Sequence, residues 1–227
     1  MDFFLACLPV FKRLPEEALE RLSRALALRR YGKGQAIFMD GDAPRAVYLL
    51  KSGLVKAVKY SRREEPVTME IIVPGGLFGM IAVLDRKTYP VSAVCIRDSE
   101  AYEIPGRVFE DLLRTNPDFS RAVYSEIGEH LRQAHTLRAM GREAVSRRIA
   151  YILHLLAQSM GKELSIGRED IAEMCSTTQE TVIRTLSEFR RKKLIASGWK
   201  RIVVLRSEGL EKLYSSPDGP PDESRKS

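Results

Sequence analysis

Residues 176–195, STTQETVIRTLSEFRRKKLI, combine two different stripes along one short segment. At 3.6 residues per turn, Val182, Leu186 and Phe189 form an apolar stripe. The second stripe carries an amide, a carboxylate and a guanidinium, which are groups that bind base edges in the major groove of DNA. The pattern therefore predicts a helix that reads DNA sequence. The residues expected to face the bases are Gln179, Glu180, Ile183 and Arg184.

Two structural interpretations compete with this reading of the second stripe. Thr177 and Glu180 have the spacing of a capping box, in which the glutamate only closes the helix N-terminus. Arg184 lies four residues after Glu180 and could simply form an ion pair with it. The basic run 190–193 is assigned to phosphate or solvent rather than to base recognition. The residues expected to contact the DNA backbone are Arg168, Thr178, Thr181, Ser187, Lys200 and Arg201.

The charge of the chain is unevenly distributed. The formal net charge is +7, and residues 138–206 hold 14 Lys and Arg against 7 Asp and Glu, so the whole excess lies in this segment. Such a distribution favours an anionic polymer as partner. A solvated basic face is the alternative.

The elements around the reading helix indicate a DNA-binding domain. Residues 167–175 form a short amphipathic helix, 176–178 a tight turn, and 194–205 a hairpin with a Ser-Gly-Trp-Lys tip. A helix, turn, helix and β-wing make a winged helix-turn-helix, whose second helix enters the major groove. We assign this domain to residues 141–214, including a further helix at 142–160. Residues 215–227 are expected to be a disordered tail.

The first half of the chain has a different character. A helical segment at 15–28 precedes short apolar or alternating runs between residues 31 and 105, separated by Gly, Pro and Asp. This spacing is typical of a β-sandwich or barrel, with an exposed hairpin tip at 61–66. Residues 1–116 are therefore expected to form a β-barrel domain with flanking helices, and the fold class is α+β.

A long helix is expected at residues 117–140, after Asn116-Pro117 ends the preceding one. Its apolar positions follow the rhythm of a coiled-coil seam, which favours a homodimer. Packing against the chain's own barrel is the alternative, and both can hold on different faces. The boundary with the DNA-binding domain is placed near Met140-Gly141. The predicted seam residues are Val123, Ile127, His130, Ala134 and Leu137.

Several classes of protein are disfavoured by what the sequence lacks. It has no nucleophile–base pattern, no HExxH and no P-loop, so we expect a protein that is not an enzyme. It has no apolar run of 18 residues, so no membrane span is expected. Three dispersed cysteines fit a reducing cytoplasm. A regulatory subunit that binds a ligand and docks onto an enzyme, without DNA readout, remains the rival function.

Together these segments resemble the Crp/Fnr transcription regulators, from Leu8 to about Leu213. The resemblance rests on LPVFKRLPEEAL, GKGQAIFMDGD, YLLKSGLVKAV and PGGLFG, and on LSIGREDIAEMCSTTQETVIRTLSEFRRKKLI. It implies a jelly-roll barrel, a dimerisation helix, palindromic promoter sites and contact with RNA polymerase. It also implies that an effector between barrel and long helix moves the reading helices about a hinge near Gly141. Ser176 stands where the family has a turn glycine, which is strained if φ is positive.

The resemblance also bears on the effector. In the cyclic-AMP members a glutamate after PGxxFG binds the ribose and an Arg-Ser pair binds the phosphate. Met80 and Val91-Ser92 occupy those places here, and a phosphate without arginine loses its main charge-assisted partner. We therefore expect an effector other than cyclic AMP. The residues expected to line the effector pocket are Gly79, Met80, Val91, Ser92, Ile127, His130 and Leu131.

The segment YPVSAV resembles the Fnr/Dnr side of the family. An iron–sulfur cluster is not expected, because the N-terminal region has only Cys7 and dispersed cysteines cannot supply four ligands. Haem sensing stays open, with His130 the first candidate ligand, His135 and His154 further ones, and Met80 or Cys7 weaker ones. No metal site is assigned. An organic anion, a redox change at Cys95 or no effector are equally compatible.

The resemblance refines the expected DNA site. Gln179 replaces the arginine of the cyclic-AMP type, whereas Glu180 and Arg184 retain the family's E-x-x-x-R pair. An inverted repeat is expected whose half-sites contain a G·C step, closer to a TTG-type than a TGTGA-type element. The loop at 157–163 lies where relatives touch polymerase, which suggests activation.

Overall fold

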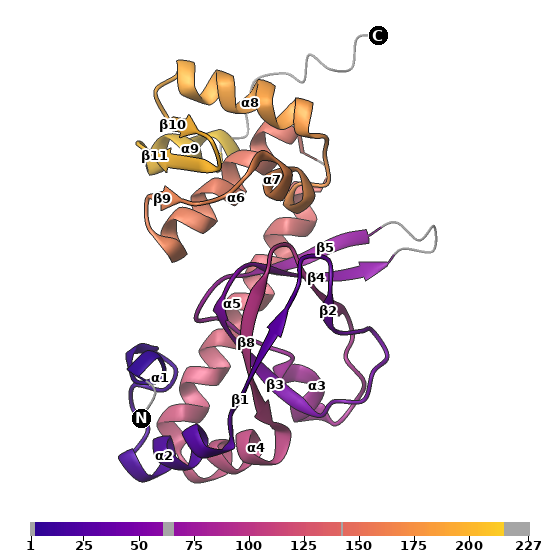
Figure 1. Cartoon of the computed structure of the whole chain (residues 1–227), viewed down its shortest axis with the longest axis vertical. Coiled ribbons are helices and arrows are strands. Elements are labelled where there is room, and N and C mark those ends of the chain that lie inside the picture. The colour runs from indigo at the N-terminus through magenta and orange to yellow at the C-terminus, as the bar shows by residue number, and fades with distance from the viewer. Residues whose placement is uncertain (1–2, 61–65, 142, 216–227) are drawn as a thin grey trace. The chain divides into compact units, whose positions relative to one another are not determined.

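A computed structural model describes residues 3–60, 66–141 and 143–215. Within it the chain divides into two compact units, one ending at His135 and the other beginning at Thr136 (Figure 1). The predicted hairpin tip at 61–66 lies outside the described residues except for Pro66. The predicted disordered tail lies outside them except for Ser215, which ends the last helix.

The first unit is built on two antiparallel four-stranded sheets, in the strand orders β1-β8-β3-β6 and β2-β7-β4-β5. This arrangement matches the barrel predicted from the spacing of short apolar runs. The strands are β1 (Ala27–Tyr31), β2 (Ala36–Phe38), β3 (Ala46–Ser52), β4 (Val55–Tyr60), β5 (Pro66–Ile72), β6 (Leu77–Phe78), β7 (Ser92–Cys95) and β8 (Ser99–Pro105). The helices are α1 (Phe3–Cys7), α2 (Glu16–Ala25), α3 (Met80–Asp85), α4 (Gly106–Thr115) and α5 (Pro117–Met140), of which the last turn of α5, from Thr136, belongs to the second unit.

Strand β3 is apolar on both faces because each face meets a different core. Ala46, Tyr48 and Leu50 point into the barrel interior. Val47 and Leu49 alternate with them and join a second core that lies between the sheet and the helices. Successive side chains of a strand point to opposite sides, so this one strand links both cores.

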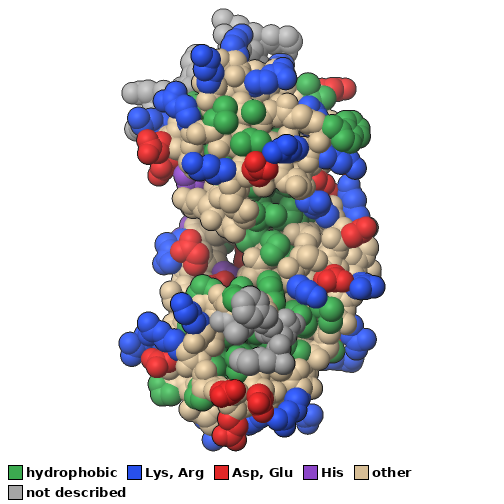
Figure 2. Space-filling view, turned by 60° about the vertical axis from the view of Figure 1, so that its left-hand side comes forward, with side chains coloured by type: hydrophobic (Ala, Val, Ile, Leu, Met, Phe, Trp, Pro, Cys, Tyr) green, Lys and Arg blue, Asp and Glu red, His purple; other side chains and the backbone are tan. Residues whose placement is uncertain are grey.

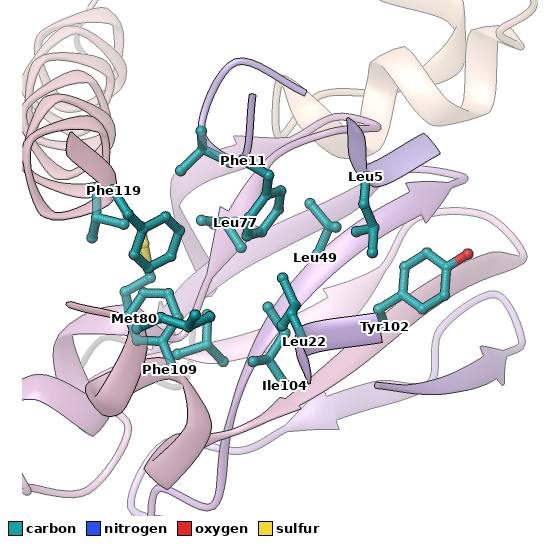
Figure 3. Close-up of a cluster of buried hydrophobic side chains, with 14 of the residues drawn as sticks. Leu5, Phe11, Leu22, Leu49, Leu77, Met80, Tyr102, Ile104, Phe109 and Phe119 are labelled. Atoms are coloured by element: carbon teal, nitrogen blue, oxygen red, sulfur yellow. The ribbon is translucent and has the colours of Figure 1, made fainter. Parts of the chain in front are cut away.

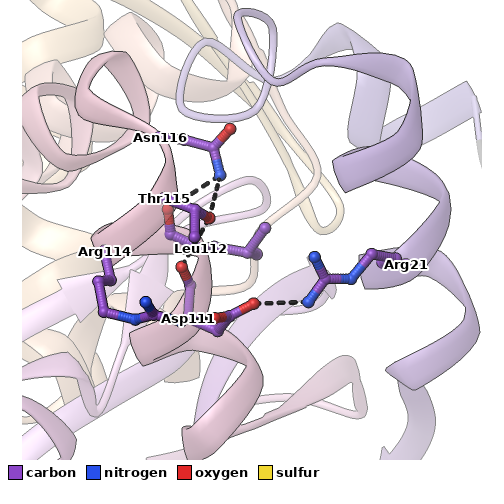
Figure 4. A network of polar contacts seen from close by, with 6 residues as sticks. All are labelled: Arg21, Asp111, Leu112, Arg114, Thr115 and Asn116. Carbon is purple, nitrogen blue, oxygen red and sulfur yellow. Dashed lines mark hydrogen bonds and ion pairs between the residues drawn. The ribbon is translucent and has the colours of Figure 1, made fainter.

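The second core is closed by helices α1, α2, α4 and α5 (Figure 3). Phe119 on α5 stacks on Phe11 and meets Phe109 edge-on, with ring centroids 5.7 Å apart in both pairs. Next to this core, Asp111 on α4 accepts hydrogen bonds from Arg21 on α2 and from Arg114 (Figure 4). Apolar packing with a polar connection at its edge therefore holds the helices against the sheet.

One boundary differs from the sequence prediction. The helix expected at 15–28 ends at Ala25, and Ala27 begins strand β1. Ala27 and Leu28 pair with Glu103 and Tyr102 of β8. Helical periodicity continues through Leu28 in the sequence, but strand β8 would otherwise lie at an open sheet edge. Tertiary pairing overrides the local pattern here.

Helix α5 turns most of its predicted seam toward its own barrel. Val123 is fully buried in the second core, and Ile127 packs partly against that core. The seam prediction is therefore wrong at Val123, because that side chain is already covered within one protomer. The exposed large apolar side chains of α5 are instead Tyr124 and Leu131, which are 68% and 57% exposed.

The second unit contains α6 (Val145–Met160), α7 (Arg168–Met174), α8 (Gln179–Arg191) and α9 (Ser207–Ser215), with a three-stranded sheet in the order β10-β11-β9. The strands are β9 (Glu163–Leu164), β10 (Ile195–Gly198) and β11 (Arg201–Val204). Val182, Leu186 and Phe189 are buried, as the apolar stripe predicts. Helix α9 was not expected from the sequence.

Candidate nucleic-acid interface and ligand cavity

Helices α7 and α8 are joined by a Schellman turn. The Thr177 N–H donates to the Ala172 carbonyl at 2.9 Å, and the Ser176 N–H donates to the Glu173 carbonyl at 3.4 Å. Ser176 sits at the residue after the C-cap, with φ of 48°. Glycine is favoured there because it adopts positive φ without a Cβ clash. Because Ser176 has positive φ, its backbone is strained, as predicted from the sequence for a residue that is not glycine.

A Ser176→Gly variant is expected to raise the free energy of unfolding by up to about 1 kcal/mol. Relief of the left-handed backbone exceeds the added chain entropy of glycine in the unfolded state. Ser159→Gly, in the last turn of α6, is the control and should lower stability by about 0.5–1 kcal/mol. Urea unfolding measures both, and a similar loss in the two variants would contradict strain at Ser176.

The N-terminus of α8 is capped by Thr178, whose Oγ1 accepts from the Thr181 N–H at 3.3 Å. With Thr178 as the N-cap, the third helical position is Thr181, so Glu180 is not the closing residue of a capping box. No ion pair joins Glu180 to Arg184 among the residues described here. Neither structural interpretation of the second stripe therefore accounts for these two side chains.

The second stripe forms an exposed face at the start of α8. Gln179, Glu180 and Arg184 are exposed, and Ile183 is 46% exposed between them. The buried stripe on the other side anchors the helix to its unit. The arrangement offers an amide, a carboxylate and a guanidinium within about two turns, in the positions from which such helices contact bases.

The hydroxyls predicted to contact the DNA backbone have local roles. Thr178 and Thr181 form the cap, and the Ser187 hydroxyl donates to the Ile183 carbonyl at 2.9 Å. A hydroxyl used in this way retains a lone pair that can accept, but its position is set by the helix. All three lie on or beside the exposed stripe.

The predicted cationic contacts are divided between α7 and the β10–β11 wing. Arg168 is half-buried as the first residue of α7. Arg201 forms an ion pair with Glu163 at 2.8 Å, and Lys200 lies 6.0 Å from the centre of the Trp199 ring. Figure 2 shows Lys and Arg side chains spread over the visible face of this unit, at the top of the view.

Trp199 was missed as a functional candidate. It is the only tryptophan of the chain, and its side chain is 84% exposed at the tip of the wing. Tryptophan is enriched at interaction surfaces because its large ring also carries a hydrogen-bond donor. The sequence signal that could have identified it is a tryptophan at the tip of the Ser-Gly-Trp-Lys hairpin.

The first unit contains a cavity of about 340 Å³. Its walls are formed mainly by apolar side chains. Gly79 belongs to the lining and has φ of 77°, and a Cβ at this position would lie 3.1 Å from the Tyr89 ring. Ser92 does not line it, because the Ser92 hydroxyl accepts from the Asp40 N–H inside the fold at 2.9 Å. The predicted residues that do line the cavity are Gly79, Met80, Val91, Ile127, His130 and Leu131.

The polar groups of the cavity centre on His130. Its Nδ1 lies 3.0 Å from Glu70 Oε1, and its Nε2 lies 3.5 Å from Glu126 Oε1. Burial by itself would lower the pKa of His130, but the hydrogen bond to Glu126 and the charge of Glu70 raise it above its ordinary value. Burial raises the pKa of the Glu70 carboxyl, and the nearby imidazolium opposes this rise. Neither glutamate was singled out from the sequence, where both look like ordinary surface residues.

Comparison with known proteins agrees with both units. The cyclic nucleotide-binding domain model matches residues 28–116, and the Crp-like helix-turn-helix domain model matches residues 139–213. The chain is a member of the Crp/Fnr family of transcription regulators. The predicted α+β fold, with a β-barrel, a long helix and a winged helix-turn-helix, is confirmed.

Individual relatives within the Crp/Fnr family are distant. The cyclic AMP receptor protein of Thermus thermophilus is 28% identical over 207 residues, which cover 90% of this chain and 96% of that protein. The global nitrogen regulator of Synechococcus elongatus is 24% identical over 201 residues, covering 84% and 90%. The structure of FixK2 from Bradyrhizobium japonicum superposes with a TM-score of 0.72 at 21% identity, covering 85% and 99%, and so shares the fold.

In this Crp/Fnr family member the surroundings of His130 do not suit haem ligation. Both ring nitrogens already lie near carboxylates, so iron ligation would require one ion pair to be given up. The cavity lining, as far as the structure describes it, includes no lysine or arginine to pair with the haem propionates. His154 is also engaged, since its Nδ1 lies 3.3 Å from the Ser207 carbonyl and its Nε2 lies 2.7 Å from Gln158.

The two buried cysteines are poorly suited to thiol switching. Cys95 and Cys175 lie in different units and are both buried. Burial raises the pKa of the Cys95 thiol, and raises that of Cys175 to about 12. The thiolate is the reactive form, so a redox signal at Cys95 is disfavoured.

Among the residues that the structure describes, no helix is long and apolar enough to cross a bilayer.

Stability of the first unit is expected to fall as pH rises above about 6.5. The folded state holds the His130 proton more tightly than the unfolded chain, because the hydrogen bond to Glu126 and the charge of Glu70 raise the pKa of its imidazole. A raised pKa contributes stability that is fully present below the unfolded value and is lost as pH rises through the folded value. The raised pKa of Glu70 acts in the same direction from about pH 4.5 upward.

The His130→Gln variant should lose the part of this pH dependence that lies above about 6.5. His135→Gln, on an exposed histidine of the same helix, should retain it. Urea unfolding at fixed protein concentration over a pH series measures the slope, and equal slopes in the two variants would contradict the role of His130.

Proposed function

We propose that this Crp/Fnr regulator binds palindromic promoter DNA as a homodimer and reads each half-site with the exposed face of α8. The observation that carries this proposal is the exposed group of Gln179, Glu180, Ile183 and Arg184, whose charged members have no ion-pair partner among the described residues. Arginine binds guanine through two hydrogen bonds, and glutamate accepts from the cytosine amino group. A G·C step of a TTG-type half-site suits this pair.

The proposed dimer contact lies on α5, turned by one residue from the seam expected from the sequence. Tyr124 and Leu131 are seven residues apart and exposed, and Ile127 and Ala134 are partly exposed beside them. Gly128 lies between the two large side chains and has no side chain of its own to hold helices apart. A second copy of α5 would cover this apolar stripe with knobs-into-holes packing.

An effector in the barrel cavity is proposed to bias the protein toward the state that binds DNA. A ligand shifts such an equilibrium only through its different affinity for the two states. Residues Ile127, His130 and Leu131 line the cavity and belong to the proposed dimerisation helix, so ligand contacts act on that helix directly. The effector is proposed to be other than cyclic AMP, because Met80 and Val91 replace its ribose and phosphate partners.

A role at promoters also implies contact with RNA polymerase and action in the cytoplasm. The segment at 157–163, at the end of α6, is the proposed polymerase contact. Ser159 and Gly161–Glu163 are exposed there, which leaves this segment accessible to another protein.

Selection of bound duplexes from a random DNA library tests the proposal. We expect enrichment of an inverted repeat with a G·C step in each half-site and half-sites about 10–10.5 base pairs apart, because paired reader helices meet successive major grooves. Binding should weaken steeply with salt. Enrichment of no sequence would favour the rival function, a regulatory subunit that does not read DNA.

Trp199 is expected to report on DNA binding directly. If the wing lies against the DNA backbone, fluorescence of this single tryptophan should change on addition of the selected duplex. Trp199→Ala should weaken all duplexes by a similar factor, since backbone contacts carry no sequence information. An unchanged emission at saturating DNA would place the wing tip away from the duplex.

A further inference from the structure

The cavity of the first unit is built for apolar contact. Phe38 stacks on Tyr89 with ring centroids 3.9 Å apart, and Phe38 and Phe78 are 6.0 Å apart. All three rings line the cavity. Its volume of about 340 Å³ lies at the lower end of the range for small-molecule sites. The walls therefore suit a compact ligand with an apolar or aromatic body.

Most of the polar groups near the cavity are already used within the fold. The Tyr89 hydroxyl donates to the Ala46 carbonyl at 2.6 Å. The Ser92 hydroxyl accepts from a backbone N–H and lies outside the lining. The other polar side chains of the lining are Glu70 and His130. Both ring nitrogens of His130 lie near carboxylates, so the Glu70 carboxylate, which can accept several hydrogen bonds, is the group left for a ligand.

The charge of this pair selects the ligand. Within the described lining no lysine or arginine occurs, and His130 is shared between the carboxylates of Glu70 and Glu126. An anionic ligand would bring a third negative charge to a single imidazole, in surroundings where charges are weakly screened. A neutral or cationic donor meets no such repulsion, because a carboxylate accepts hydrogen bonds only.

The rim of the cavity is apolar as well. Ile81 on α3 belongs to the lining and is 52% exposed, outside the proposed dimer contact on α5. A ligand with an apolar body can thus enter across apolar surface.

We propose that this cavity binds a small, largely apolar molecule without negative charge, whose polar end donates a hydrogen bond to Glu70. The inference rests on the proposed function only in taking the cavity as the effector site. Ligand binding is measured without DNA, so a failure of DNA recognition and a failure of this inference give different results.

The headgroup preference is tested on the unmodified full-length chain. Nile red, a neutral dye that fluoresces in apolar surroundings, is bound first and then displaced by three molecules with the same body: 4-phenylbutan-1-ol, 4-phenylbutylamine and 4-phenylbutanoate. We expect the alcohol and the amine to compete at concentrations about tenfold or more below the carboxylate, because like charges in a buried site repel strongly. Equal competition by the carboxylate would overturn the proposal, and so would failure of both donors to compete.

A matched pair of variants tests the role of Glu70. Glu70→Gln removes the buried carboxylate and keeps the shape of the side chain, so the amine should lose affinity and the carboxylate should gain it. Glu129→Gln removes an exposed carboxylate of the same helix as His130 and should leave the order of the three headgroups unchanged. Circular dichroism melting confirms that both variants fold. Identical headgroup preferences in the two variants would show that Glu70 does not contact the ligand.

Discussion

Replacing Leu131 by glutamate is expected to leave the protein monomeric at concentrations where the unmodified chain is a dimer. Leu131 is one of two large apolar side chains exposed on the described part of α5, seven residues from Tyr124. In a symmetric dimer the substitution would place two carboxylates opposite each other in an apolar seam, where each is desolvated without a partner. Sedimentation equilibrium measures the mass directly.

The same variant should lose affinity for a two-half-site duplex by roughly a hundred- to ten-thousandfold. Two linked reader helices gain from effective concentration, and a monomer loses this gain. Binding to a single half-site should change little, because α8 is untouched. Fluorescence anisotropy with both duplexes separates the two effects.

Ser125→Glu is the matched control for the dimer seam. Ser125 is exposed on α5, one residue after Tyr124 and therefore about 100° around the helix from it. The variant adds the same charge to the same helix outside the proposed contact and should remain dimeric. Loss of the dimer in both variants would place the contact on a broader face, and a dimeric Leu131→Glu protein would contradict the proposed seam.

Arg184→Ala is expected to cost about 1–3 kcal/mol in binding of the selected duplex and to relax specificity at one base pair of each half-site. Arg184 is exposed on the second turn of α8 and has no ion-pair partner within the described structure. Its guanidinium is thus available for two hydrogen bonds to guanine. The measurement is anisotropy with the selected duplex and with duplexes changed at single positions.

Arg191→Ala provides the comparison for Arg184. Arg191 is exposed at the far end of the same helix and is assigned to phosphate or solvent. Its loss should weaken all sequences equally and reduce the salt dependence by about one counterion. If Arg184→Ala showed this uniform pattern instead, Arg184 would be a phosphate contact and the assignment of the reader face would fail.

Glu180→Gln refines the same assignment. The carboxylate accepts from cytosine, whereas an amide can also donate, so the variant should admit other bases at the paired position. Because the N-cap is Thr178 and not Thr177, this substitution removes no cap. It should lower the free energy of unfolding by no more than about 0.3–1 kcal/mol, through the lost interaction of a first-turn carboxylate with the helix dipole. Recognition and stability are thus separable at this residue.

Helix α8 was predictable from sequence because its determinants are local. The spacing of Val182, Leu186 and Phe189 follows from the period of the helix, and burial of that stripe leaves the other face in solvent. The hairpin with Trp199 at its tip and the turn at Ser176 likewise depend on neighbouring residues alone. Even the sign of φ at Ser176 could be anticipated, from the resemblance to a family with glycine at that place.

Contacts between distant segments decided the remaining features. Strand β1 forms where helical periodicity continues, because its pairing with Tyr102 and Glu103 is worth more than one further helical turn. The seam of α5 could not be assigned from its rhythm, since Val123 and Tyr124 are adjacent and only the barrel determines which of them is covered. A helix pattern locates a stripe but does not say which surface buries it.

The character of the cavity depended most on the tertiary structure. Glu126 precedes His130 by four residues on α5, so helix spacing alone places these two side chains together. Glu70 lies in β5, and only the fold brings its carboxylate to His130. Ser92 was expected to face a ligand, but its hydroxyl accepts a hydrogen bond from the Asp40 backbone N–H instead. Sequence alone determined the fold class and the face of α8 that is left exposed, through periodicity and turn chemistry. The tertiary structure decided which charges are buried together, because burial is a property of the whole packed barrel.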